Sequence, residues 1–368
     1  MPLDMGKEQY YLFNYNTAVG YSNAFKKQIC GQLEKEGLIT FDENKKDLIK
    51  KYYERKNYNY IIEDTANNDE FISFYEKLEY TKSYKYSIPF FYEGEINLND
   101  LINNKILINF EQYNHVDGYY IADDMKDVQP IVYQADDKII VKFVLQKFYA
   151  NETDNNIDYR YIILVYIDTA NNVLEIRYDS IKNAGELDYK SKYEANLDYC
   201  INWIMEKLNF KLYKCKYADF TDIINNDESG NVKIFRQMMN MGKKGSADLV
   251  ASEETDFKLP FIGEIRALMD ENAVLFDNSP EIKEILEKFL YDKEATASYP
   301  YIYLLWINSV SSRNFITKVT FQYFINQYIL IQHINDNCPD FRMERMNYAI
   351  GYLAKSGAIA KGEELGYK

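Results

Sequence analysis

Apolar residues recur at every third or fourth position in the first 85 residues, which predicts helices. In the clearest case, Ser22 can cap a helix that ends at Gly37. The apolar face of this helix repeats every four residues: Phe25, Ile29 and Leu33. The polar run Asn67–Asp69 predicts the start of another helix. We therefore predict a mainly helical N-terminal region over residues 1–85.

The apolar positions then adopt a period close to two, which is typical of β-strands. The segments rich in Ile, Val, Tyr and Phe are predicted strands: 105–110, 130–133, 137–149, 159–168 and 173–179. The polar residues 169–172 predict a turn between the last two strands. Residues 161–167 are apolar on both faces, so we expect their strand to be central. Together these strands predict an antiparallel meander.

Helical spacing returns after the predicted sheet. A long helix is expected from Tyr193 to Leu208, and the alternation over 210–217 adds another strand. Ser279 followed by Pro280 is a favourable helix start. The following apolar residues are predicted to form the buried stripe of that helix: Ile282, Ile285, Leu286, Phe289 and Leu290.

The last 70 residues are apolar in long runs. Residues 299–307 are expected to form a strand or a buried helix, and 315–334 a core helix. A last helix is predicted to end near Gly357. The resulting fold class is α+β, with a central antiparallel β-sheet (meander), a packed long helix and helical regions at both ends. The predicted division is 1–85, 86–245 and 246–368, because 368 residues are too many for one core.

Composition excludes several broad classes. The chain has 43 Lys and Arg against 57 Asp and Glu, a net charge of −14, which argues against general binding to nucleic acid or anionic membranes. Two histidines exclude a three-histidine metal site within one chain. The 36 tyrosines fit either codon bias in an AT-rich bacterial or phage genome or a surface made for contacts.

The absence of recognisable targeting signals favours the cytoplasm. The N-terminal residues lack the basic and apolar segments of a secretory signal, and the four cysteines are far apart in sequence. No apolar run approaches the ~18 residues of a membrane-spanning helix. We therefore expect a cytoplasmic protein with no membrane partner.

Three charged residues on two neighbouring predicted strands are the first candidates for catalysis. Asp168 ends one strand, and Glu175 and Arg177 lie on the next. This D-x6-E-x-R pattern resembles the core of the PD-(D/E)xK nucleases, which implies an Mg²⁺ held by Asp168 and Glu175. Arg177 stands where that family has lysine, and arginine does not exchange protons in the same way. A simple Glu175–Arg177 salt bridge is the alternative interpretation.

Two helix ends share the pattern L-x-x-x-G-x-I, at Leu33–Ile39 and Leu353–Ile359. Each resembles the helix end that precedes the wing strand in winged-helix DNA-binding domains, and plain helix capping is the alternative. Basic residues follow the first copy, and under this hypothesis they would bind phosphates: Lys45, Lys46, Lys50, Lys51 and Arg55. The second copy is followed by Glu363 and Glu364, which would disfavour nucleic acid there.

The remaining candidates are isolated. Lys243, Lys244 and Ser246 lie in a glycine-rich segment that could bind an anion, but their order is not that of a P-loop, and an interdomain loop is the alternative. His115 is a candidate general base in a predicted loop, whereas His333 is predicted to be a core residue. Cysteines 30, 200 and 215 are expected to act as small hydrophobes.

The absence of a strong catalytic motif favours a non-catalytic interaction or regulatory protein without cofactors. Its expected partner is another protein or a second copy of the chain, and its expected setting is a bacterial or mobile-element system, such as antiphage defence. An Mg²⁺-dependent nuclease is one alternative. A DNA-binding regulator is the other, with nucleic acid as its partner.

Overall fold

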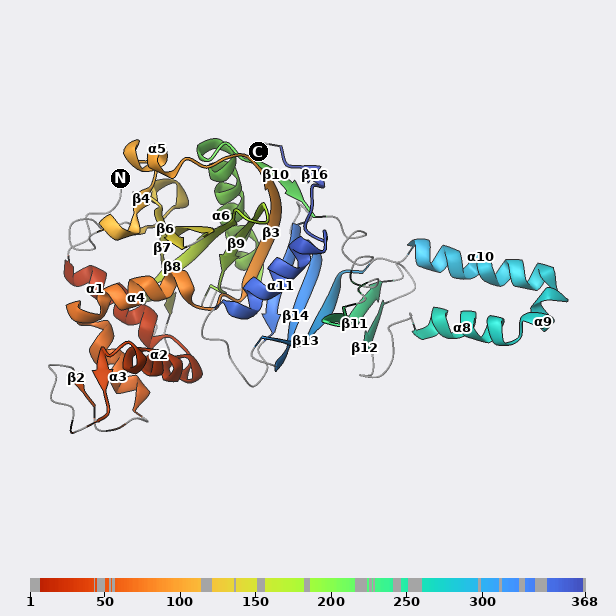
Figure 1. The fold of residues 1–368 in the computed structure, drawn as a ribbon, viewed down its shortest axis with the longest axis horizontal. Coiled ribbons are helices and arrows are strands. Elements are labelled where there is room, and N and C mark those ends of the chain that lie inside the picture. The colour runs from red at the N-terminus through yellow and green to blue at the C-terminus, as the bar shows by residue number, and fades with distance from the viewer. Residues whose placement is uncertain are drawn as a thin grey trace. The chain divides into compact units, whose positions relative to one another are not determined.

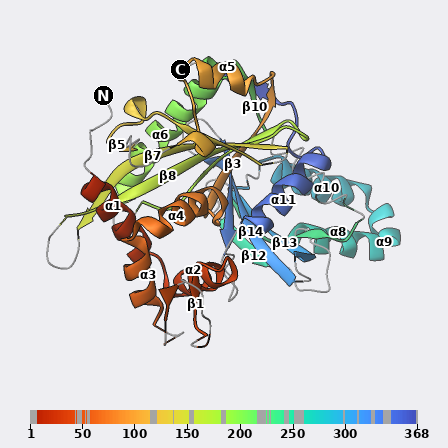
Figure 2. The same cartoon turned by 60° about the vertical axis from the view of Figure 1, so that its left-hand side comes forward.

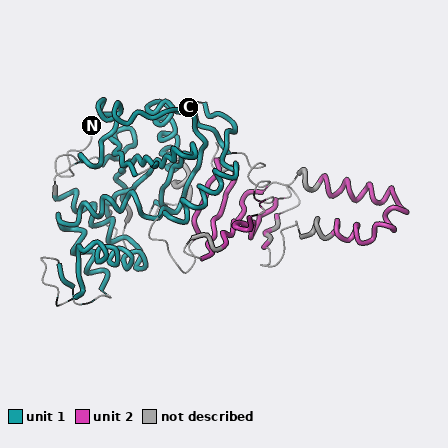
Figure 3. Tube along the Cα trace, in the orientation of Figure 1, with its two compact units in different colours: residues 1–215, 335–368 teal, residues 216–334 magenta. Residues whose placement is uncertain are grey.

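The computed structural model assigns the chain to two compact units, 1–215 with 335–368, and 216–334 (Figure 3). The described residues exclude the following positions: 1–6, 43, 45–49, 53, 55–56, 114–120, 136, 151–155, 182–185, 216–223, 225–226, 228, 241–245, 251–259, 297–298, 311–312, 324–327, 335–342 and 367–368. Helices and mostly antiparallel strands occur in each unit, so the fold class is α+β, as predicted. The three-part division at residues 85 and 245 stays a prediction.

Helices cover much of the first unit (Figure 1). They are α1 (Lys7–Val19), α2 (Asn23–Lys35), α3 (Tyr58–Ala66), α4 (Asp69–Thr81), α5 (Leu98–Asn103), α6 (Glu186–Lys207) and α11 (Glu344–Lys355), with two 3₁₀ turns, Phe110–Gln112 and Met125–Asp127. Ser22 caps α2 by accepting a hydrogen bond from the backbone N–H of Phe25, as predicted. Gly37 ends the helix with a φ of 74°, and the backbone N–H of Leu38 returns to the carbonyl of Leu33.

The main sheet of the first unit has the order β3-β9-β8-β7-β6-β4. Its strands are β3 (Tyr86–Glu93), β4 (Ile108–Asn109), β6 (Ile131–Ala135), β7 (Lys138–Ala150), β8 (Asn156–Asp168) and β9 (Val173–Tyr178). The strands β6 to β9 pair successively in antiparallel fashion, which confirms the predicted meander. The longest pairing, between β7 and β8, runs from Lys138 opposite Asp168 to Ala150 opposite Asn156.

Five short strands complete the described part of this unit: β5 (Ile121–Ala122), β10 (Lys211–Lys214), β16 (Glu363–Glu364) and the separate pair β1 (Ile39–Thr40) with β2 (Lys50–Lys51). β10 pairs with β3 and β16 in antiparallel fashion, and β5 pairs with β7 in parallel. β1 and β2 also pair in parallel, so they do not form a hairpin.

Helices pack on both faces of β7 and β8, which explains why these strands are apolar on both sides. On one face, α1 and α4 lie against the sheet (Figure 2). Tyr10 of α1 and Ile72 of α4 belong to the same buried cluster as Ile140 and Leu164 of the sheet. On the other face, the Trp203 ring of α6 meets the Phe143 ring edge-on at 5.2 Å. The predicted long helix therefore packs on the predicted sheet. The adjacent strand residues point to opposite faces because the side-chain period is two.

The second unit contains an antiparallel sheet of order β12-β11-β13-β14-β15. Its strands are β11 (Val232–Asn240), β12 (Ser246–Val250), β13 (Tyr301–Val310), β14 (Arg313–Tyr323) and β15 (Tyr328–Ile334). The predicted core helix over 315–334 is therefore wrong. Buried residues alternate along β14 at Phe315, Thr317 and Val319, which is the period of a strand half-covered by its neighbours.

Three helices lie between β12 and β13 in the sequence: α8 (Pro260–Glu271), α9 (Ala273–Asp277) and α10 (Pro280–Thr296). α8 and α10 run side by side in opposite directions, with α9 at the turn (Figure 1). Pro280 is the first residue of α10, and the carbonyl of Ser279 accepts hydrogen bonds from the N–H groups of Ile282 and Lys283. This confirms the predicted helix start. Among the described residues, no helix combines the length and apolarity needed to span a membrane.

Candidate functional site

The residues of the nuclease hypothesis lie on one face of the hairpin formed by β8 and β9. Glu175 stands opposite Tyr166, and Asp168 stands opposite Val173. Both Glu175 oxygens accept hydrogen bonds from Arg177, from Nε at 2.9 Å and from Nη2 at 2.6 Å. Ser87 donates a further hydrogen bond to Glu175 at 2.6 Å. Because Glu175 and Arg177 are both 1% exposed, this geometry is that of a buried structural ion pair.

Asp168 stabilises the turn that joins the two strands. Its Oδ1 accepts hydrogen bonds from the backbone N–H groups of Ala170 and Asn171, each at 3.1 Å. Its Oδ2 lies 2.6 Å from Nζ of Lys138. Burial alone would raise the pKa of Asp168, but the hydrogen bonds from Lys138 and Asn171 hold it below its usual value.

No group of three His, Cys, Asp or Glu side chains is placed to hold a metal ion within the described ranges. The structure thus brings Asp168, Glu175 and Arg177 to one face, where their polar atoms already have protein partners. The Mg²⁺ of the nuclease hypothesis stays a prediction.

The predicted basic cluster is described only in part, because Lys45, Lys46 and Arg55 lie outside the described residues. Lys51 is exposed, and the Nζ of Lys50 lies 2.7 Å from Oδ2 of Asp64. This ion pair offsets the charge that Lys50 would offer to a phosphate. Of the predicted anion site, Lys243 and Lys244 also fall outside the described residues, while Ser246 begins β12 and is exposed.

Among the described residues, the candidate histidine and cysteine side chains are buried and do not form a reactive centre. Cys30, Cys200 and Cys215 are buried, and burial raises the pKa of each thiol, to about 12 for Cys30. The thiols therefore stay protonated at neutral pH. His333 is buried in β15, a strand where a helix was predicted, and His115 lies outside the described residues.

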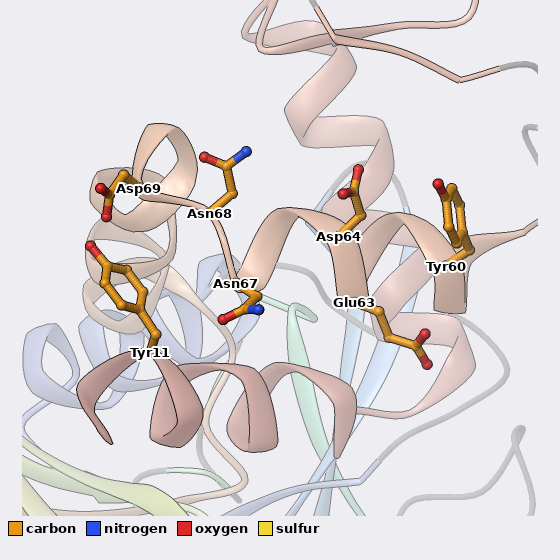
Figure 4. Close-up of a pocket in the computed structure, with 7 residues that line it drawn as sticks. All are labelled: Tyr11, Tyr60, Glu63, Asp64, Asn67, Asn68 and Asp69. Atoms are coloured by element: carbon orange, nitrogen blue, oxygen red, sulfur yellow. The ribbon is translucent and has the colours of Figure 1, made fainter. Parts of the chain in front are cut away.

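An acidic pocket of about 610 Å³ lies beside α1, α3 and the start of α4 (Figure 4). Tyrosine, carboxylate and carboxamide groups line it: Tyr11, Tyr60, Glu63, Asp64, Asn67, Asn68 and Asp69. The hydroxyl of Tyr52 donates to Asp64 at 2.5 Å, and Asn68 caps α4 by accepting from the backbone N–H of Glu70. Two of the lining side chains therefore already serve the local fold. No pattern in the amino-acid sequence indicates this pocket, because its lining comes from three separate helices.

A second feature missed from sequence is a buried network of four charges. Glu76 and Glu79 of α4 face Lys142 of β7 and Arg160 of β8, and all four are at most 4% exposed. Lys142 lies 2.8 Å from Glu79, and Arg160 lies 2.7 Å from Glu76. The hydroxyl of Tyr10 also donates to Glu76. Two positive and two negative groups compensate one another, so the network joins α1 and α4 to the sheet.

The network also fixes the protonation state of its members. Burial opposes the ionised form of Glu76, but the charges of Arg160 and Lys142 outweigh it and lower its pKa to about 2. Burial likewise opposes the charge of Lys142, and the two carboxylates reverse this effect and raise its pKa. Glu76, Lys142 and Arg160 are therefore charged at neutral pH. The perturbed pKa values thus follow from burial and from the neighbouring charges of the network.

The helical hairpin of the second unit carries a different kind of surface. Leu290 of α10 is buried in a small cluster with Met269 of α8 and Met239 of β11. Three other apolar residues of α10 face away from this cluster: Ile282 is 55% exposed, Ile285 68% and Phe289 45%. We call these three residues the outer stripe. The prediction that all the apolar positions of this helix are buried is wrong for the outer stripe.

The sequence of α10 itself indicates that one neighbouring helix cannot cover all of its apolar residues. The five apolar positions between 282 and 290 span an arc of about 140° on a helix, whereas a single buried face needs about 100°. In the hairpin, α8 covers only the side that carries Leu290 and the half-buried Leu286. α9 adds two more exposed residues at the turn, Val274 at 74% and Leu275 at 66%. Among the described side chains, α9 and α10 thus expose these five large apolar residues in addition to Tyr291.

No family model matches the chain, and neither a curated protein nor a solved structure is similar to it.

Proposed function

We propose that this chain is a non-catalytic interaction protein that binds its partner through α9 and α10. The observation that carries the proposal is the exposure of the outer stripe together with Val274 and Leu275. Folded monomers rarely leave large contiguous apolar patches in water, and such patches mark binding surfaces. Full burial of one such side chain contributes about 1.5–3 kcal/mol, so a partner that covers the stripe gains affinity.

The charges around this surface favour a protein partner. Residues 260–296 contain nine acidic and four basic side chains. This excess of negative charge would repel nucleic acid and the anionic lipids that attract basic amphipathic helices. The exposed apolar residues follow a helical spacing, which suits packing against another helix.

A photo-crosslinking amino acid at position 285 tests the proposal in living cells that express the protein. Tyr291 is a matched control site, because it is also 68% exposed and lies on the opposite side of the same helix. We expect a specific protein adduct from position 285 and none from position 291. The adduct is identified by mass spectrometry, and the complex is then rebuilt from purified components.

Adduct formation is then compared between the wild-type outer stripe and a variant in which the stripe is disrupted. The adduct should disappear when Ile282→Glu and Phe289→Glu are introduced together. Equal adducts from positions 285 and 291, or no adduct from either, would contradict the proposal. The cytoplasmic location, the bacterial or antiphage setting and the two nucleic-acid alternatives stay predictions, and none of them is needed for this test.

A further inference from the structure

We infer that the outer stripe binds a second copy of this chain, with the two α10 helices antiparallel about a two-fold axis near Ile285. The inference rests on the proposed function and names its partner. Three observations carry it: the spacing of the stripe, its position on the helix and the charges that border it.

The spacing suits packing between two helices. Ile282, Ile285 and Phe289 are separated by three and four residues, which is the apolar repeat of helices that pack with a shallow crossing angle. Ile285 is the middle residue of the stripe and also its most exposed member. A two-fold axis near Ile285 therefore places Ile282 of one copy toward Phe289 of the other, so each copy covers the same three residues of its partner.

The bordering charges select the antiparallel orientation. Glu281 and Lys288 are both exposed, and they lie on the same side of the stripe, two helical turns apart. In an antiparallel pair, Glu281 of each copy approaches Lys288 of the other, which gives two attractive contacts. In a parallel two-fold pair, Glu281 and Lys288 of one copy would lie on the opposite side of the seam from Glu281 and Lys288 of the other, so neither attractive contact would form. Opposite charges beside an apolar seam specify orientation in this way.

The extent of the surface sets the expected affinity. The outer stripe covers about two helical turns, and α9 adds two residues beside it. An interface of this size is at the small end for specific complexes, so we expect a reversible dimer with a dissociation constant in the micromolar range.

Sedimentation equilibrium of the purified full-length chain, from about 1 μM to about 200 μM, measures this affinity directly. We expect a monomer–dimer equilibrium for the wild type. Ile285→Glu should raise the dissociation constant at least about tenfold, because a charge would be buried at the axis. The matched control Tyr291→Glu, on the opposite side of α10, should leave the dissociation constant unchanged.

Charge reversal tests the orientation. Glu281→Lys and Lys288→Glu should each weaken the dimer by about threefold to tenfold at low salt, because each creates two like-charge contacts. The double variant should return to the wild-type dissociation constant, since it restores both attractive contacts. All substituted side chains are exposed, and the thermal unfolding of each variant checks that it is folded.

The outcomes separate this inference from the proposed function. A chain that stays monomeric over the whole range overturns the inference, as does a dimer that Ile285→Glu leaves unchanged. Failure of the double charge reversal to restore the affinity overturns the antiparallel pairing. An adduct from position 285 to a different protein, with a monomeric purified chain, supports the proposed function and overturns self-association.

Discussion

Nη1 of Arg160 lies 2.7 Å from Oε1 of Glu76, in an ion pair whose two side chains are almost completely buried. Arg160 is on the central strand β8, and Glu76 is on α4, so this contact joins a helix to the sheet. Charges without water depend wholly on their protein partners. Removal of either partner should therefore destabilise the first unit.

Arg160→Met should lower the free energy of unfolding by about 3–5 kcal/mol, because it leaves buried carboxylates without one of their two cationic partners. Urea unfolding followed by circular dichroism measures the change. Lys283→Met is the matched control, since Lys283 forms a 2.9 Å ion pair with Asp277 on an exposed helix surface. Its effect should be below about 1 kcal/mol. Similar losses in the two variants would contradict the assigned role of the buried network.

The stability of the first unit should fall in acid through Glu76. The folded-state pKa of Glu76 is lowered from 4.5 to about 2, so its contribution is complete above the unfolded pKa and is lost as the pH falls from about 4.5 to about 2. The linked stability is on the order of 3 kcal/mol. Urea unfolding between about pH 7 and about pH 3 should show a steeper loss for the wild type than for Glu76→Gln. Parallel curves would argue against this assignment.

Leu290→Ala should lower the free energy of unfolding much more than Ile285→Ala, although both residues are apolar and lie on α10. Leu290 is 1% exposed, so its truncation should cost about 2–4 kcal/mol through lost burial and a cavity. Ile285 is 68% exposed, and its truncation should change the unfolding free energy by less than about 0.5 kcal/mol. Thermal unfolding at a protein concentration below the dimer dissociation constant makes the comparison. Equal losses would mean that something covers the outer stripe.

Gly37→Ala and Gly31→Ala should have opposite effects on the stability of the protein, although both change the same helix, α2. Gly37 has a φ of 74°, which an alanine adopts at a cost of about 1 kcal/mol, whereas Gly31 lies inside α2. A Cβ at either position meets nothing within 4 Å, so backbone preference alone decides the sign. Gly31→Ala should therefore stabilise the protein by about 0.5–1 kcal/mol. Denaturation midpoints measure both changes, and a stabilised Gly37→Ala variant would refute the prediction.

The purified protein should not nick plasmid DNA with Mg²⁺ or Mn²⁺, because both Glu175 oxygens accept hydrogen bonds from Arg177 inside the protein. Gel electrophoresis of supercoiled plasmid measures the result. Nicking that Asp168→Ala abolishes would instead support the nuclease alternative. Nicking that survives in Asp168→Ala would identify a contaminant or another site, and a preparation purified by a different route distinguishes these two.

Local sequence patterns predicted the elements that depend on near neighbours. The alternation of apolar residues identified β7 to β9, and Ser22 and Gly37 marked the two ends of α2. The pattern failed at 315–334, where apolar residues on both faces resemble a buried helix. The segment forms β14 and β15 instead: β14 carries the half-buried Ile316 on its second face, and the first four residues of β15 are all buried.

The candidate sites were less predictable because they depend on what tertiary structure places beside each residue. Lys142 and Arg160 are 18 positions apart in sequence, and only the β7–β8 register brings them to the same carboxylates. The outer stripe was predicted as core because helical spacing reveals an apolar arc but not the element that covers it. Exposure of Ile285 is therefore a property of the fold rather than of α10 alone.

β11 pairs directly with β13, although β12 and the three helices α8 to α10 lie between them in the chain. The hydrogen bonds of that strand pair do not require the helices to have any particular length. A change in the length of the helical hairpin α8 to α10 would therefore leave the pairing of β11 with β13 unaltered. A change in the surface of these helices would then leave the strand pairing intact, in the way that surface loops vary on rigid frameworks.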